Sequence, residues 1–315
     1  FKENTLVFAL TLANLLACIL TAVICIRKGV FPRRQSRTLQ LQKQKSILQK
    51  GLYLFLYNSC FYFILISIRT IISVNYTVEE FGYFTFSFTI ANAVMLLLDS
   101  FNTILFPKTI DLMSSDDNKK KADALEKMRV GYILTSHMLV YLAMICFPVL
   151  VWFIPKYMPA LSSMNMIALA VLMNTNSYGY SNMLIAQNKE HKAGFISAVS
   201  LIVNIILGLG LAKILNVEYS YITIAILVAY MISSFLMAYE GDTILRREKS
   251  VSYTLKHFFP IRMFIPYMIA LIISCTQIEY LIFIPLLVFI MLNYKDLQFL
   301  KNIALKLIKE PEVID

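Results

Sequence analysis

Three ionisable side chains lie inside long apolar runs of this 315-residue sequence: Arg69, Asp99 and His137. A charged side chain at the centre of a lipid-embedded helix costs roughly 2.5–3.5 kcal/mol on insertion scales, so such residues usually face a cavity or a partner. An arginine suits bidentate capture of a phosphate or carboxylate. An aspartate can hold a proton or cation, and a histidine titrates near neutral pH.

Arg69 shares a helix face with Asn58, eleven residues before it, and with Tyr62 at helical spacing. This stripe predicts one wall of a cavity in which Arg69 binds an anionic group, although Leu65 interrupts it. Arg69 also lies about five residues, or roughly 8 Å, inside the end of its apolar run. It could therefore extend outward to lipid headgroups instead, and both interpretations stay open.

Asp99 shares a face with Asn92 and Asn102, at spacings of seven and three residues. It could pair with Arg69 on the neighbouring span, bind a proton or cation linked to movement, or make structural hydrogen bonds. His137 lies a turn or two inside its own apolar run, where it could titrate. A lone histidine at that depth more often hydrogen-bonds within the bundle.

The run Asn174–Asn182, Asn-Thr-Asn-Ser-Tyr-Gly-Tyr-Ser-Asn, is too polar to face lipid. Asn165 and Asn176 share one helix face, with Tyr180 beside them. Neutral amides and phenol rings are the groups that sugar binding needs. The structural alternative is hydrogen bonding between helices, which is worth roughly 0.6 kcal/mol per bond.

No enzymatic signature accompanies these residues. The sequence has no Ser/His/Asp order, no H-E-x-x-H, no Walker loop and no metal-type cysteine spacing. We therefore predict no catalytic residue, no metal site and no cofactor. The five cysteines all lie in apolar runs: Cys18, Cys25, Cys60, Cys146 and Cys275.

Membrane-spanning helices must position these side chains. Of all residues 58% are apolar and 15% are charged, whereas soluble domains are about 25% charged. Runs of roughly 20 apolar residues bounded by charge, Pro or Gly predict nine spans, and hence an all-α polytopic bundle. The spans are approximately 5–26, 52–74, 82–106, 130–154, 160–186, 194–215, 219–239, 261–276 and 280–294.

Positive charge is unevenly divided between the connections. Of the 29 Lys and Arg residues, 25 fall on one side of the predicted spans, three on the other, and Arg69 within a span. Because cytoplasmic loops carry the excess, the C-terminus is predicted inside and the first residue outside. An outside start at Phe1, without a signal sequence, indicates a fragment that continues from upstream spans. The basic stretch Arg27–Lys50 could lie on anionic lipid or be a plain linker.

Three segments between Ile47 and Met113 carry a family resemblance. They are Lys50-Gly51-Leu52-Tyr53 opening a span that ends Ser67-Ile68-Arg69-Thr70-Ile71-Ile72-Ser73, Val78-Glu79-Glu80-Phe81-Gly82-Tyr83-Phe84, and Leu105-Phe106-Pro107-Lys108. In these segments the chain resembles the polysaccharide-biosynthesis, or O-antigen (oligosaccharide-lipid), flippases of the multidrug/oligosaccharidyl-lipid/polysaccharide (MOP, MATE-like) exporter superfamily. The similarity continues to about Gly241. Family members often carry an acid just before the arginine, where this sequence has Ile68.

The resemblance implies two six-helix lobes that face each other across a cavity. On that pattern residues 1–26 are the last helix of a first lobe whose remainder is missing, and residues 27–50 are a basic cytoplasmic linker. Residues 51–241 form the second lobe, and residues 242–315 an additional helix pair and tail.

The resemblance also implies a function: translocation of an undecaprenyl-diphosphate-linked oligosaccharide across the bacterial plasma membrane, for O-antigen, capsule or exopolysaccharide synthesis. The basic charge of Arg27–Lys50 makes anionic lipids candidate partners of that stretch, and the resemblance makes a polysaccharide polymerase and a chain-length regulator candidate partners; no nucleic acid is expected. Under this hypothesis the residues expected to bind substrate are Arg69, Asn58, Tyr62, Asn165, Asn176 and Tyr180, and those expected to couple an ion are Asp99 and His137.

Two other functions stay open. A drug or cation antiporter of the same superfamily would share every topological feature. An integral-membrane glycan transferase or ligase would act on the same lipids, but it usually needs a large outer loop with catalytic residues. The longest predicted outer connections are only a few residues each.

Overall fold

The computed structural model describes residues 3–27, 37–114, 118–246, 250–276 and 278–309, and every secondary-structure element in these ranges is a helix. The chain divides into two units, residues 1–51 and 52–315. The first unit holds α1 (Glu3–Arg27) and the start of α2 (Arg37–Asn75). Of the basic stretch predicted to contact lipid, residues 28–36 lie outside the described residues. Residues 37–50 belong to α2, so the helix continues without a break at the predicted start of the second lobe.

Among the described residues, six helical segments are long and apolar enough to cross a membrane. The expectation of an all-helical, membrane-embedded chain is confirmed at this level, whereas the predicted number of nine spans is not confirmed. Two further apolar helices, Thr11–Arg27 and Ile261–Thr276, are shorter. The six segments are Gln42–Asn75, Val78–Ser100, Met128–Phe153, Pro155–Thr175, Glu190–Ile214 and Tyr219–Leu245.

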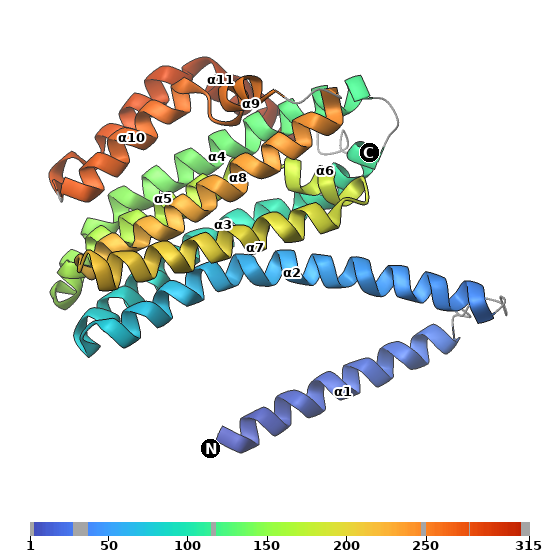
Figure 1. Cartoon of the computed structure of the whole chain (residues 1–315). Helices are drawn as coiled ribbons and strands as arrows, with labels where there is room; N and C mark the ends of the chain where they lie inside the picture. Colours follow the sequence, from blue (N-terminus) through green and yellow to red (C-terminus); the bar gives the residue numbers. More distant parts are fainter. Residues whose placement is uncertain (1–2, 28–36, 115–117, 247–249, 277, 310–315) are drawn as a thin grey trace. The chain divides into compact units, whose positions relative to one another are not determined.

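The second unit is a bundle of long helices that run alongside one another (Figure 1). Its long members after α2 are α3 (Val78–Ser114), α4 (Asn118–Phe153), α5 (Leu161–Thr175), α7 (Glu190–Leu209) and α8 (Thr223–Arg246). Shorter elements are α6 (Tyr180–Ala186), α9 (Val251–Phe258), η1 (Pro155–Ala160), η2 (Gly210–Ile214), η3 (Tyr219–Ile222) and η4 (Glu279–Leu281). The C-terminal pair is α10 (Ile261–Thr276) and α11 (Ile284–Lys309).

Helix α5 is the centre of this bundle. Of the apolar window in the candidate span Pro155–Thr175, which holds η1 and α5, 78% is buried, against 22–56% for the other five candidate spans. Helix α5 packs against α3, α4, α8 and α10, and the Tyr267 hydroxyl on α10 donates to the Leu169 carbonyl (3.2 Å). Polar groups near the end of α5 therefore meet other helices or internal cavities, not lipid.

The C-terminal pair belongs to the same unit. Helices α10 and α11 pack on each other, α10 also contacts α5, and α11 contacts α4. The short α9 connects α8 to this pair and packs on α8. We call the end of the bundle where α4 begins, α8 ends and α9 lies the α9 end.

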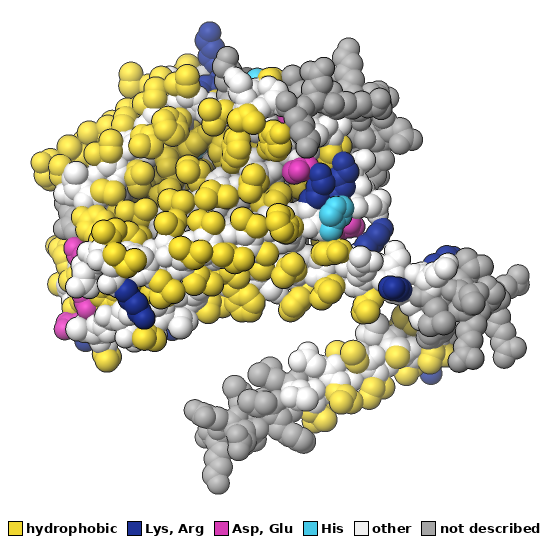
Figure 2. Space-filling view, viewed as in Figure 1, with side chains coloured by type: hydrophobic (Ala, Val, Ile, Leu, Met, Phe, Trp, Pro, Cys, Tyr) yellow, Lys and Arg dark blue, Asp and Glu magenta, His cyan; other side chains and the backbone are white. Residues whose placement is uncertain are grey.

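The surface of the bundle is suited to lipid. On the face seen in Figure 2 hydrophobic side chains cover most of the bundle, and charged side chains gather toward its ends. On α7, Phe195, Ile202 and Ile206 are 69, 56 and 64% exposed. Because apolar patches of this extent are rare on soluble monomers, the surface fits a membrane-embedded protein.

Candidate functional site

The central helix breaks where a continuous span, 160–186, is predicted. Thr175 Oγ1 donates to the Leu172 carbonyl (2.7 Å), and Ser177 Oγ donates to the Asn174 carbonyl (2.8 Å). Such bonds compete with the helical hydrogen-bond ladder. Gly179 then takes a φ of +82°, which glycine adopts without steric cost. The prediction of an uninterrupted span is therefore wrong, since the polar run forms a turn between α5 and α6.

A cavity of about 500 Å³ lies beside this turn, among α2, α3, α4, α5 and α6; we call it the polar cavity. Amides, hydroxyls and phenol rings line most of it, with one carboxylate, and its described lining includes no Lys, Arg or His. The residues that carry its chemistry are Asn58, Asp99, Asn102, Tyr132, Tyr178 and Asn182.

The polar cavity combines aromatic faces with unsatisfied polar atoms. Tyr132 and Tyr178 stack with ring centroids 4.0 Å apart and planes inclined by 20°. Within the described part of the chain, the buried Asn182 Nδ2 and Asn102 Oδ1 have no hydrogen-bond partner. A buried polar atom left unpaired costs roughly 1–3 kcal/mol unless a ligand or water binds it. The cavity therefore combines aromatic faces with polar atoms that a ligand or water could satisfy.

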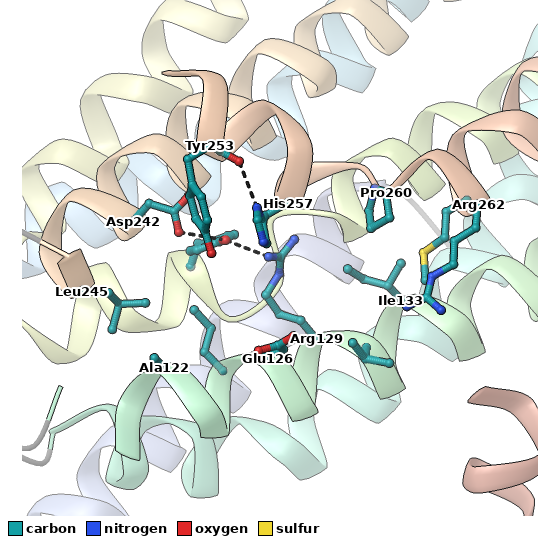
Figure 3. Close-up of a pocket in the computed structure, with 14 residues that line it drawn as sticks. Ala122, Glu126, Arg129, Ile133, Asp242, Leu245, Tyr253, His257, Pro260 and Arg262 are labelled. Atoms are coloured by element: carbon teal, nitrogen blue, oxygen red, sulfur yellow. Dashed lines mark hydrogen bonds between the residues drawn. The ribbon is translucent and has the colours of Figure 1, made fainter. Parts of the chain in front are cut away.

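A second cavity, of about 570 Å³, lies at the α9 end; we call it the Arg129 cavity. Figure 3 shows residues from α4, α8, α9 and the start of α10 gathered around it. Those labelled are Ala122, Glu126, Arg129 and Ile133 on α4, Asp242 and Leu245 on α8, Tyr253 and His257 on α9, Pro260, and Arg262 on α10.

Arg129, only 7% exposed, is the buried cation of this cavity. Its Nη1 donates to the Tyr180 hydroxyl oxygen (2.7 Å), and its guanidinium carbon lies 4.2 Å from the Tyr180 ring centroid. Tyr180 in turn donates to Asp242 Oδ1 (3.1 Å), and Thr254 Oγ1 donates to Asp242 Oδ2 (2.8 Å). The Tyr180 phenol thus bridges the opposite charges of Arg129 and Asp242. Together with Thr254, these side chains connect α4, α6, α8 and α9.

The second guanidinium nitrogen of Arg129, Nη2, hydrogen-bonds to the backbone. Arg129 Nη2 donates to the Asn176 carbonyl (3.1 Å) in the turn and, at 3.5 Å, to the Phe258 carbonyl at the end of α9. Carbonyls at helix ends lack intrahelical partners. One buried arginine therefore satisfies both the helix break and the end of α9.

Gly241 lets α8 approach Tyr180, which gives a testable consequence. A Cβ at Gly241 would lie 2.4 Å from Tyr180 Cδ1, whereas one at Gly82 would meet nothing within 4 Å. Gly241→Ala is expected to lower the free energy of unfolding by about 1–3 kcal/mol, because the Tyr180 ring must move. Gly82→Ala should leave it unchanged or raise it slightly. Thermal unfolding of both variants in detergent checks this, and equal effects would contradict it.

Two of the predicted site residues come together in the polar cavity: Asn58 on α2 and Asp99 on α3. Asn102, which the sequence places on the same helix face as Asp99, also lines the polar cavity.

Arg69 and Tyr62 line neither cavity. The Arg69 guanidinium lies 5.5 Å from the Phe81 ring centroid, near the start of α3, and Tyr62 is 54% exposed. Asp99 is 18 residues beyond Phe81 on the same helix, or roughly 27 Å along its axis. The suggested Arg69–Asp99 ion pair is therefore wrong.

The predicted Asn165–Asn176–Tyr180 seam is divided. Asn165 is buried in α5 and lines neither cavity. Asn176 contributes its backbone carbonyl to Arg129, and its side-chain Nδ2 donates to the Met173 carbonyl (3.4 Å). Tyr180 lines the Arg129 cavity. The helix break separates these residues, because it rotates everything after residue 176 relative to α5.

His137 is fully buried among aromatic rings. Its Nδ1 lies 3.1 Å from the Tyr141 hydroxyl, and its ring stacks on Phe289 of α11 with centroids 5.6 Å apart. Its Nε2 has no hydrogen-bond partner in the described structure. His137 lines neither cavity, so the geometry supports its packing role over ion coupling.

Sequence reasoning missed Arg129 and Asp242. Arg129 directly precedes the predicted span 130–154 and is one of the 25 basic residues on the same side, and Asp242 lies three residues beyond the predicted span 219–239. The available signal was two opposite charges at predicted span ends on the same side. The local sequence does not reveal that either side chain is buried. The residue that packs on Arg129, Tyr180, lies 51 residues away in the chain.

Fold and cavities define the class: an α-helical, membrane-embedded protein with internal polar cavities. In comparisons with family models, curated proteins and solved structures, nothing matches this chain.

Proposed function

We propose that this protein is a membrane transporter that moves a lipid-linked oligosaccharide across the bacterial plasma membrane. The observation that carries the proposal is the polar cavity inside a bundle of apolar helices, with an unpartnered donor on Asn182 and an unpartnered acceptor on Asn102. A polar ligand that binds these two atoms would remove the cost of leaving them unpaired.

The chemistry of the cavity favours a sugar. A sugar ring offers hydroxyls that donate and accept, and apolar C–H faces that contact aromatic rings. The amides of Asn58, Asn102 and Asn182 can both donate and accept, and the stacked Tyr132 and Tyr178 supply the ring surface. Without a described basic residue in its lining, the cavity suits the glycan and not the diphosphate.

In this proposal Arg69 binds the diphosphate. Arg69 is part-buried near the end of α2 away from the polar cavity, and its contact with Phe81 leaves its N–H donors available. A guanidinium binds phosphate oxygens bidentately. Arg69 and the polar cavity would then hold the two chemically different parts of one extended lipid-linked sugar.

In this proposal Asp99 binds the proton or cation whose movement drives transport. It is the one carboxylate in the described lining of the polar cavity and is half-buried on α3. Intramembrane carboxylates commonly bind the proton or cation that drives transport. The interrupted α5–α6 segment lines the same cavity, and discontinuous helices beside substrate sites are frequent in secondary transporters.

Asp99 also favours a second candidate function, a drug or cation antiporter. The phenol rings of Tyr57 and Tyr132 line the same cavity as this carboxylate. Aromatic faces and one negative charge attract an organic cation. The amide-rich lining fits the sugar better, because a cation leaves the Asn182 donor unpaired.

The test is clearance of the lipid-linked intermediate in cells that lack their own flippase. Wild type is expected to clear lipid-linked oligosaccharide from the inner leaflet. Asp99→Asn and Arg69→Ala should each reduce the clearance rate at least tenfold, because they remove the coupling carboxylate and the diphosphate anchor. Lys213→Ala, at an exposed position outside both cavities, is the control and should clear normally.

If wild type left the intermediate accumulated with several donor glycans, the flippase proposal would fail. Efflux of organic cations by wild type, lost in Asp99→Asn, would then establish the antiporter.

A further inference from the structure

The Arg129 cavity lies where several apolar segments end together. The candidate spans begin at Met128 on α4 and end at Leu245 on α8, and the apolar α10 begins at Ile261. The lining of the cavity runs from Ala122 to Ile133 and includes Leu245 and Met263, so it straddles all three ends. In a membrane-embedded bundle, that level is the boundary between headgroups and acyl chains.

The lining changes from charged to apolar across this level. Glu126, Tyr253 and His257 lie on the side beyond the apolar segments, on α4 and α9. Val130, Ile133 and Met263 lie within the apolar segments. The occupant that matches both sides has a charged head and an apolar tail. The volume, about 570 Å³, is within the roughly 300–1,000 Å³ range of small-molecule sites.

The polar side carries both signs of charge. Glu126 is exposed at the rim, and no hydrogen bond or ion pair of its carboxylate is among those of the described residues. Arg262 is exposed and pairs with Asp296 through one nitrogen, which leaves the other N–H donors of its guanidinium for a ligand. His257 Nδ1 lies 3.1 Å from the Tyr253 carbonyl. That contact leaves the other ring nitrogen, Nε2, to hydrogen-bond a ligand in the cavity.

The buried pair does not supply a net charge to a ligand, because Arg129 and Asp242 balance each other through Tyr180. A carboxylate can nevertheless accept more than one hydrogen bond per oxygen, so Asp242 keeps acceptor capacity. The site therefore offers acceptors on Glu126 and Asp242 and donors on His257 and Arg262.

We propose that the Arg129 cavity is a binding site for an aminophospholipid, with the phosphate at His257 and Arg262 and the primary ammonium at Glu126 and Asp242. The proposal is independent of the transported substrate. A primary ammonium has three N–H donors for two carboxylates, whereas a choline headgroup has none and a glycerol headgroup has no positive charge. The acyl chains follow the apolar side past Val130, Ile133 and Met263.

The test is native mass spectrometry of the purified, detergent-solubilised protein titrated with phosphatidylethanolamine, phosphatidylglycerol or phosphatidylcholine. We expect phosphatidylethanolamine to bind at least tenfold more tightly than the other two lipids. In Glu126→Gln/His257→Ala, which changes two exposed side chains, this affinity should fall at least tenfold with the unfolding temperature retained. The matched control is Glu218→Gln/His191→Ala, which removes the same side-chain types at exposed positions outside the cavity and should bind like wild type.

Competition with soluble glycerophosphoethanolamine tests whether the cavity binds the whole lipid or only its headgroup. It should not displace the lipid at a hundredfold excess, because it lacks the acyl chains that contact the apolar side. Equal competition by the soluble headgroup would overturn the lipid assignment. Equal binding of phosphatidylglycerol, or full phosphatidylethanolamine affinity in Glu126→Gln/His257→Ala, would overturn the site itself.

Discussion

Replacing Arg129 with alanine is expected to lower the free energy of unfolding by about 3–5 kcal/mol, the range for removing one partner of a buried charge pair. Asp242, 7% exposed, would keep its charge with Tyr180 and Thr254 as hydrogen-bond donors but without a nearby cation. The Asn176 and Phe258 carbonyls would lose their donor at the same time. The helix break and the end of α9 should both loosen.

Unfolding in detergent, followed by circular dichroism during thermal or denaturant titration, measures this loss. The control is Lys192→Ala, which removes a more exposed ion pair with Glu240, with side chains 35 and 22% exposed. That pair should contribute about 0–1 kcal/mol. Arg129→Met/Asp242→Asn should recover at least half of the loss, because it leaves no unpaired buried charge. A double variant as unstable as Arg129→Ala would contradict the charge-pair explanation.

Tyr132→Ala is expected to weaken binding of a lipid-linked oligosaccharide about 10–100-fold. The ring forms a stacked pair with Tyr178 in the polar cavity, and loss of an aromatic stacking surface typically costs about 1–3 kcal/mol. Each tenfold change in affinity corresponds to about 1.4 kcal/mol. Titration of the purified, folded protein with an undecaprenyl-diphosphate oligosaccharide, read by intrinsic fluorescence, gives the dissociation constant.

Tyr132→Phe is the matched control for this prediction. It keeps the ring and removes only the hydroxyl, whose bond to the Leu98 carbonyl is long at 3.5 Å. Affinity should therefore stay within about threefold of wild type, since only a marginal hydrogen bond is lost. Equal losses in the Ala and Phe variants would mean that the hydroxyl, and not the stacking surface, contacts the ligand.

Hydrophobicity along the chain was enough to predict an all-helical, membrane-embedded protein, because the free energy of transfer to lipid depends on each segment's own side chains. The same reasoning put Asn58 on a cavity-facing stripe and left the role of Asp99 open, since polar groups in apolar runs rarely face lipid. Both line the polar cavity. The identity of the ligand stays a proposal.

Helical periodicity fixes the face of a residue but not which residues share a cavity. Asn58 and Arg69 lie on one face of α2, yet eleven residues separate them by roughly 16 Å along the axis. One lines the polar cavity, and the other contacts Phe81 near the far end of the bundle. Residues on the same helix face therefore do not have to line the same cavity.

Tertiary structure alone decided the helix break and the role of Arg129. In sequence, the Asn174–Asn182 run is compatible with a polar helix face, and Arg129 with a loop cation at the end of a span. In the fold, Arg129 reaches Tyr180, 51 residues away, and Phe258, 129 residues away. The burial of a charge depends on partners brought together by packing, so no local pattern could reveal it. Hydrophobicity determined which segments are apolar enough to cross a membrane, and helix packing determined which of their polar groups meet.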